Sequence, residues 1–142
     1  MKNEQNQSSI FRRVILSDKK EAKKMIAEAL VYFENLQRSG LAHDISEFNF
    51  RLALDEAIEN AISHGNSFNP EKKIIITITG FSDKVDMTIE DEGAGFKPES
   101  QLEKSAANDF FSPHGRGLCL LNNIGTIRWN KKGNSINVVL VA

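Results

Sequence analysis

The chain has 142 residues with 18 basic and 19 acidic side chains, so it is long enough for one compact domain and carries a formal charge of -1. That balance gives no general attraction to nucleic acid or to an anionic membrane. A single cysteine excludes an internal disulfide and a cysteine-rich zinc site. We find neither a membrane-spanning run of roughly 20 apolar residues nor the apolar core of a signal peptide, so we expect a cytoplasmic protein.

The beginning of the chain predicts a short tail, a strand and a long helix. Residues 1–9 hold almost no apolar side chains and predict a disordered tail. Residues 10–16 are predicted to form a strand. Apolar side chains at helical spacing then predict a helix over about residues 18–39, and Asp18 and Glu21 have the spacing of a capping box at its start.

The middle of the chain predicts a second helix followed by a hairpin. The helix covers about residues 45–64, starts near Asp44, and is the most apolar of the chain, so we place it at the centre of its layer. β-Branched residues and alternating polarity predict strands over residues 73–79 and 84–91. The short link between these strands predicts a hairpin.

The last third of the chain begins with a long irregular stretch. No period holds from residue 92 to residue 117, and a loop of that length inside a compact domain is usually functional or mobile. A short third helix is predicted over about residues 117–123. Two strands follow, over about residues 125–131 and 135–141, and the Lys-Gly-Asn link between them is typical of a hairpin.

This order of elements predicts an α+β fold, a two-layer sandwich with a mixed, mostly antiparallel sheet and helices on one face. Strands do not alternate with helices one for one, which argues against a doubly wound sheet. We expect residues 10–142 to form a single domain.

Two polar groups in this pattern point to chemistry. Glu56 and Asn60 lie four apart on the second helix, so they project from one side, where a carboxylate and an amide oxygen can bind Mg2+ or activate a hydroxyl. The acid Asp55 precedes Glu56 and leaves open which carboxylate acts, although the helical phase beside Asn60 favours Glu56. Further on, Asp91 ends a strand and is followed by Gly93 and by a second glycine, Gly95, an arrangement in which a carboxylate can accept a hydrogen bond from an exocyclic amine.

The third group opens the short third helix. Gly115 and Gly117 flank Arg116, and Leu118 follows. The free N–H groups and the dipole of a helix start attract phosphate, and an arginine there adds a charge-assisted contact. The pattern is neither a P-loop nor a dinucleotide fingerprint, because the residues that define those motifs are missing.

The order and spacing of the three groups resemble the ATP-binding domain shared by gyrase, the mismatch-repair ATPases and histidine kinases, the GHKL or Bergerat fold. The stretch DEAIENAISHG, from Asp55 to Gly65, is most similar to the small serine-kinase anti-sigma factors of bacteria. The resemblance covers about residues 10–142 and leaves no room for the dimerisation and phosphoacceptor helices of a histidine kinase.

This resemblance implies an ATP site. Asn60 would bind the Mg2+ that bridges the phosphates, and Glu56 would be the catalytic carboxylate that activates the acceptor hydroxyl. Asp91 would accept a hydrogen bond from the adenine amino group, with the Ser135 hydroxyl beside it. The remaining parts implied are the adenine-pocket glycines Gly93 and Gly95, the phosphate-binding residues Gly115, Arg116, Gly117 and Leu118, and an ATP lid over about residues 97–114.

The charge expected around the pocket also indicates that ATP would bind together with Mg2+. Acidic side chains are expected to gather around the pocket, where they would repel the phosphates of ATP unless a cation such as Mg2+ were present. These acids are Glu56, Glu59, Asp83, Asp86, Glu90, Asp91 and Glu92.

We therefore predict an ATP-dependent serine/threonine protein kinase that acts as an anti-sigma factor. By resemblance it phosphorylates a STAS-type anti-anti-sigma protein on serine, sequesters a sigma factor and forms a homodimer, without direct contact with nucleic acid or membrane. Two alternatives stay open: an ATP-binding switch without phosphotransfer, and a stand-alone catalytic subunit of a histidine-kinase system. The lysines of the first helix form a solvated face or part of a partner-binding surface; they are Lys19, Lys20, Lys23 and Lys24.

Overall fold

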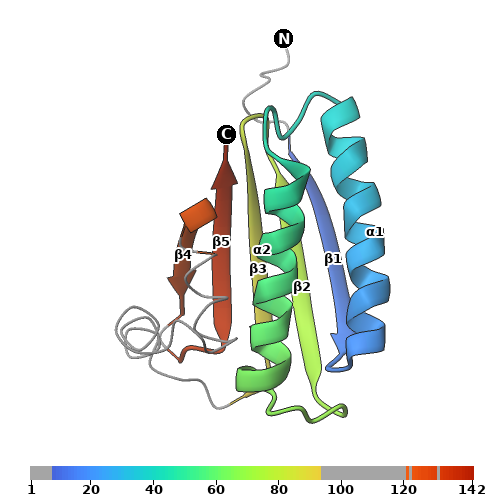
Figure 1. Ribbon diagram of the computed structural model, residues 1–142, viewed down its shortest axis with the longest axis vertical. Coiled ribbons are helices and arrows are strands. Elements are labelled where there is room, and N and C mark those ends of the chain that lie inside the picture. The colour runs from blue at the N-terminus through green and yellow to red at the C-terminus, as the bar shows by residue number, and fades with distance from the viewer. Residues whose placement is uncertain (1–7, 94–120, 122, 131) are drawn as a thin grey trace.

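The computed structural model describes residues 8–93, 121, 123–130 and 132–142 (Figure 1). The strands are β1 (Ser9–Leu16), β2 (Lys73–Gly80), β3 (Lys84–Asp91), β4 (Thr126–Trp129) and β5 (Ser135–Val141). The helices are α1 (Lys19–Arg38), α2 (Glu47–Asn60) and the π-helix η2 (Ala61–Gly65).

The strands form one sheet in the order β1-β2-β3-β5-β4, and each neighbouring pair is antiparallel. Both α-helices lie on the same face of this sheet, α1 beside β1 and α2 over the middle strands (Figure 1). α1 packs on β1, whereas α2 packs on β3 and β5. The predicted α+β sandwich is confirmed, and the most apolar helix occupies the centre of its layer.

The core lies between the helices and the sheet. Alternate residues of β2, β3 and β5 face the helices and are buried, as the period of two predicts. Phe33 of α1 stacks on Phe50 of α2 with 4.3 Å between ring centroids, which joins the two helices above the sheet. Further buried side chains are Met25, Leu54, Ile58, Ile74, Ile76, Ile78, Val85, Met87, Ile89, Ile136, Val138 and Leu140.

The helix starts differ in detail from the prediction. Asp18 caps α1 by accepting a hydrogen bond from the N–H of Lys20, but Glu21 reaches the N–H of Leu16 and not that of Asp18, so the reciprocal capping box is not formed. The cap of α2 is Ser46, two residues after Asp44, so the helix starts close to where the sequence predicts.

Ser46 forms the cap because its backbone is extended and its side chain accepts a hydrogen bond from the N–H of Asn49 at 3.2 Å. Asp44 has a left-handed backbone with φ of 60°, which is not the conformation of a helix cap.

The predicted tail is one residue too long. Ser9, which the sequence places in the tail, begins β1 and pairs with Gly80, and its carbonyl accepts a hydrogen bond from the Tyr32 hydroxyl at 2.7 Å. Leu121, Asn123 and Ile124 are helical and belong to the end of the predicted third helix, whose start lies outside the described residues. Among the described helices, none combines the length and apolar character that crossing a membrane requires.

Candidate functional site

The two polar residues singled out on the second helix lie one turn apart at the end of α2. Asn60 is its last residue, and Glu56 lies four positions earlier on the same side. Directly after Asn60 the chain continues as the π-helix η2, in which the Ser63 hydroxyl donates to the carbonyl of Glu59 at 2.8 Å. π-Helical turns are rare and often lie at functional sites. Asn60 therefore lies where the α-helix changes to a π-helix, a local irregularity that is often found at functional sites.

Asp91 ends β3 and is only 7% exposed. Its Oδ1 accepts a hydrogen bond from the N–H of Gly93 at 2.7 Å. A Cβ atom at Gly65 would lie 2.1 Å from Asp91 Oδ2, and a Cβ atom at Gly93 would lie 1.9 Å from the Gly65 carbonyl oxygen. Both positions require glycine, because the Asp91 carboxylate packs directly against Gly65, and the backbone of Gly65 against Gly93.

Asn66 holds these two ends together, a role that the sequence did not indicate. From the sequence, Asn66 only follows the predicted helix over about residues 45–64, yet in the structure it is fully buried. Its Nδ2 donates to the carbonyl of Lys73 at 3.0 Å, and its Oδ1 accepts from the N–H of Glu92 at 2.9 Å. One side chain therefore links the helix end to β2 and to the segment after β3. The only local signal is an amide residue directly after the helix.

The turn before β5 fixes the other side of Asp91. The Asp91 N–H donates to the carbonyl of Asn134 at 2.9 Å, and Asn134 Nδ2 donates back to the Asp91 carbonyl at 3.1 Å. Within the turn, Asn130 Oδ1 accepts from the N–H of Gly133 at 2.8 Å. Ser135 follows directly, so the same hydrogen bonds that close the hairpin also set its position beside β3.

Three predicted site residues line one crevice although they come from three elements. They are Asn60 from α2, Asp91 from β3 and Ser135 from β5. Gly93 is next to it through its hydrogen bond to Asp91. The rest of the lining is Ala57, Ala61, Ile89, Trp129, Gly133, Asn134 and Ile136, so apolar walls surround a few polar groups. The crevice is narrow and holds no water-sized space, so it marks where three predicted site residues meet and is not an open ligand pocket.

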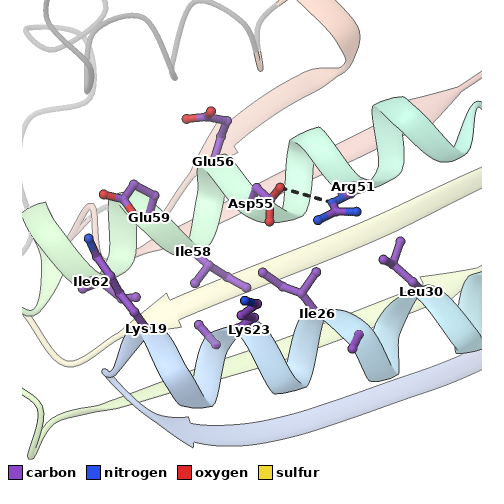
Figure 2. Close-up of a pocket in the computed structure, with 12 residues that line it drawn as sticks. Lys19, Lys23, Ile26, Leu30, Arg51, Asp55, Glu56, Ile58, Glu59 and Ile62 are labelled. Carbon is purple, nitrogen blue, oxygen red and sulfur yellow. Dashed lines mark ion pairs between the residues drawn. The ribbon is translucent and has the colours of Figure 1, made fainter.

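Glu56 lies outside this crevice, at the edge of a groove along α1 and α2 (Figure 2). Figure 2 shows Glu56 pointing away from α1 and Asp55 directed toward Arg51. The other predicted site residues, Gly95, Gly115, Arg116, Gly117 and Leu118, and the predicted lid over 97–114 lie outside the described residues.

Burial raises the pKa of the Asp91 carboxyl above its ordinary value of 3.8. The Gly93 N–H opposes this rise by stabilising the charged form, the negative Glu90 adds to it, and Lys72 and Lys132 oppose it. Within the described residues Asp91 Oδ2 accepts no hydrogen bond, so this partly desolvated carboxylate is suited to accept one from an amine of a ligand.

The two neighbouring acids of α2 differ in their partners. Burial raises the pKa of Glu56, and the negative charges of Asp55 and Glu59 raise it further. Burial also raises the pKa of Asp55, but the Arg51 guanidinium opposes that rise, and Arg51 Nε lies 3.7 Å from Asp55 Oδ2. Within the described residues Glu56 forms no ion pair. Glu56 therefore has the environment of a proton acceptor, whereas Asp55 is engaged by Arg51.

The expected gathering of acids around the pocket is wrong for part of the set. Asp83 precedes β3 at the hairpin end, opposite the end that carries Asp91. Asp86 and Glu90 alternate with the buried residues of β3 and so lie on the sheet face away from the helices. The Asp86 carboxylate accepts a hydrogen bond from Asn137 Nδ2 on that face. Strand direction and alternation separate residues that are close in sequence.

The crevice has groups that could help to hold a metal ion with its ligand. No group of three or more His, Cys, Asp or Glu side chains in the described part of the chain could bind a metal ion. Asn60 offers an amide oxygen of the kind that Mg2+ prefers, and Mg2+ usually takes its other ligands from substrate phosphates and water.

The sequence model of one protein family, the histidine kinase-like ATPase domain, matches residues 20–140. That range covers most of the chain and contains the whole crevice. No curated protein matches the chain. Membership in this family implies that the protein binds ATP and uses it in kinase-like chemistry. From the family match and the fold together, the chain belongs to the histidine kinase-like ATPase domains of the GHKL type.

Proposed function

We propose that this protein is an ATP-dependent serine/threonine protein kinase that acts as an anti-sigma factor. The observation that carries the proposal is the convergence of Asn60, Asp91 and Ser135 on one crevice, with Glu56 one helical turn from Asn60. The resemblance to serine-kinase anti-sigma factors assigns ATP-site roles to these four residues, and their closeness in the fold supports that assignment.

Each group has a chemical task in this proposal. The Asp91 carboxylate accepts a hydrogen bond from the adenine amino group, and the Ser135 hydroxyl supports the same ring. Asn60 would offer its amide oxygen to Mg2+, and that ion would neutralise charge on the transferring group. The glycines Gly93 and Gly95 let the backbone approach the nucleotide.

Glu56 is the proposed catalytic base. The acceptor serine oxygen forms a bond to the γ-phosphorus, the bond to the β–γ bridging oxygen breaks, ADP leaves, and the hydroxyl proton moves to the Glu56 carboxylate. The raised pKa of Glu56 supports this task, because a more basic carboxylate takes up the proton more readily. The ion pair between Asp55 and Arg51 supports Glu56 over Asp55.

The partners in the proposal follow from the resemblance. The acceptor is a STAS-type anti-anti-sigma protein phosphorylated on serine, and the protein also sequesters a sigma factor and forms a homodimer. Unphosphorylated acceptor would compete for the protein and release the sigma factor.

The test is transfer of label from γ-labelled ATP to a purified STAS-domain protein encoded beside this chain. We expect wild-type transfer, and a loss of about a hundredfold or more in Glu56→Gln, since general-base catalysis contributes factors of that order. Asp55→Asn is the matched control, because it removes the neighbouring acid, and it should keep most of the transfer.

The chemical stability of the product separates the alternatives. A phosphoprotein stable in acid indicates serine, whereas an acid-labile, base-stable product would indicate a histidine acceptor. Binding of Mg-ATP without transfer to any acceptor would indicate a switch module. Equal transfer by wild type and Glu56→Gln would contradict the proposed base.

A further inference from the structure

A groove of about 560 Å³ runs between α1 and α2, apart from the crevice that contains Asn60 and Asp91 (Figure 2). Its floor is apolar. Ile26 of α1 lies opposite the buried Ile58 of α2, with half-buried Leu30 toward one end of the floor and buried Ile62 toward the other. Ala22 and Ala27 keep the α1 wall low, because neither carries a long side chain.

The two rims of the groove carry opposite charge. On the α1 side stand Lys19 and Lys23, and on the α2 side stand the acids Asp55, Glu56 and Glu59. Arg51 pairs with Asp55 at 3.7 Å. Glu56 points away from α1, so the rim charges that face the groove without an ion pair, in the described part of the chain, are the two lysines and Glu59.

The length of the groove matches a short helix. Its α1 wall extends from Lys19 to Leu30. At 1.5 Å per residue this is roughly 17 Å, or about three helical turns. Because both walls are helices, they offer no free row of backbone donors and acceptors. An extended strand would gain no backbone pairing there, whereas a helix satisfies its own backbone and presents one apolar side.

We propose that this groove binds an amphipathic α-helix of a partner protein, with its apolar side on the floor, acidic side chains toward α1 and basic side chains toward α2. The opposite charges of the two rims favour a helix with one acidic and one basic edge, because a helix with two like-charged edges would be repelled at one rim. The inference goes beyond phosphotransfer, since it requires neither nucleotide nor an acceptor serine.

The desolvation seen along the α2 rim supports binding of basic groups there. Burial raises the pKa values of Asp55 and Glu56, so these carboxylates already lie in a partly water-excluded setting. Cations that reach them from a bound helix would meet weaker solvent screening than at an open surface.

The test uses a displayed library of helical peptides of about fourteen residues, long enough to fill the groove. Apolar residues occupy i, i+3, i+4 and i+7, and each flanking edge varies among Lys, Glu and Gln. We expect selection on the full chain, without ATP, to enrich peptides with one acidic and one basic edge. A helix can lie in either direction, so either edge can be the acidic one.

Two pairs of variants locate the binding. Ala27→Trp fills the groove and should weaken the selected peptides about tenfold or more in fluorescence anisotropy, whereas Lys24→Trp, outside the groove on the same helix, should leave the affinity within about twofold. Lys23→Glu should weaken the mixed-charge peptides and favour peptides with two basic edges. Lys24→Glu makes the same change of net charge and should have little effect.

Three results would overturn the inference. They are an absence of enriched peptides, equal affinity in Ala27→Trp and wild type, and a groove occupied by a second copy of this chain. The last would appear in sedimentation as a dimer that Ala27→Trp converts to monomer. None of these results depends on the phosphotransfer assay, so failure of one proposal is distinguishable from failure of the other.

Discussion

At the scale of one residue, Asp91 is placed to bind a ligand but lowers the stability of the fold when it is charged. Its carboxylate is buried between Gly65 and Gly93 and accepts one backbone hydrogen bond at 2.7 Å. Burial raises its pKa, which means that the charged form is less favourable in the folded chain than in the unfolded chain. A group that lowers stability while facing a crevice is a candidate for function.

The first prediction follows from the sign of that shift. The folded chain retains the Asp91 proton to higher pH than the unfolded chain, so ionisation lowers the free energy of unfolding as pH rises through the raised pKa. Without nucleotide, Asp91→Asn should therefore melt higher than wild type near neutral pH. The difference should shrink as pH falls toward the ordinary value of 3.8.

The same variant should bind ATP at least about tenfold more weakly, because the amide no longer offers the carboxylate acceptor. Thermal unfolding across pH and calorimetry with ATP measure the two effects. An Asp91→Asn protein that is less stable than wild type at every pH would contradict the stability argument.

The second prediction concerns Gly65. An alanine Cβ there would lie 2.1 Å from Asp91 Oδ2, so the carboxylate must move. We expect Gly65→Ala to lower the free energy of unfolding by about 1–3 kcal/mol or more and to weaken ATP binding. Gly80→Ala is the matched control, because its Cβ would meet the flexible Leu36 side chain at 2.6 Å. In urea unfolding and calorimetry, unchanged ATP affinity in Gly65→Ala would show that the contact does not position Asp91.

At the scale of elements, α2 connects the parts of the molecule. Its inner side packs on β3 and β5, its end carries Asn60, and its outer side forms one wall of the groove. The helix is predictable from its apolar spacing and from its length. Its start is not, because Asp44 and Ser46 are both residue types that cap helices. The backbone conformation at each position decides between them.

This gives the third prediction. Ser46→Ala removes the side-chain acceptor for the Asn49 N–H and should lower the free energy of unfolding by about 1 kcal/mol. Asp44→Gly removes the competing carboxylate while tolerating the positive φ of 60°, so it should change stability by no more than a few tenths of a kcal/mol. Denaturant unfolding compares the two variants. A larger loss in Asp44→Gly would mean that the cap lies at Asp44.

At the scale of the whole molecule, the site depends on three parts of the chain that are distant in sequence. Asn60 and Asn66 flank η2, Asp91 ends β3, and Asn134 lies in the turn before β5. Ligand that binds only the folded chain should stabilise this assembly as a unit.

The fourth prediction measures that coupling. At a concentration of Mg-ATP about a hundred times the dissociation constant, the folded state gains about 2.7 kcal/mol, which should raise the melting temperature by roughly 5–10 °C. Asn60→Ala should lose most of the Mg2+-dependent part of the shift, and EDTA should do the same to wild type. An equal shift by ATP with and without Mg2+ would contradict a metal-binding role for Asn60.

The sequence by itself determined the elements and the family. Period-two alternation defines the sheet, helical spacing defines α1 and α2, and the ordered polar groups lead to an ATP-binding fold, because these signals are local. The convergence of Asn60, Asp91 and Ser135 could be expected only through the resemblance.

Tertiary structure alone decided the rest. It showed the bridging role of Asn66, the close approach of Gly65 to Asp91, and the removal of Asp83 and Asp86 from the pocket. It also formed the charged groove between α1 and α2. These features depend on strand direction, on which face a side chain takes, and on contacts between distant segments, none of which a local pattern contains.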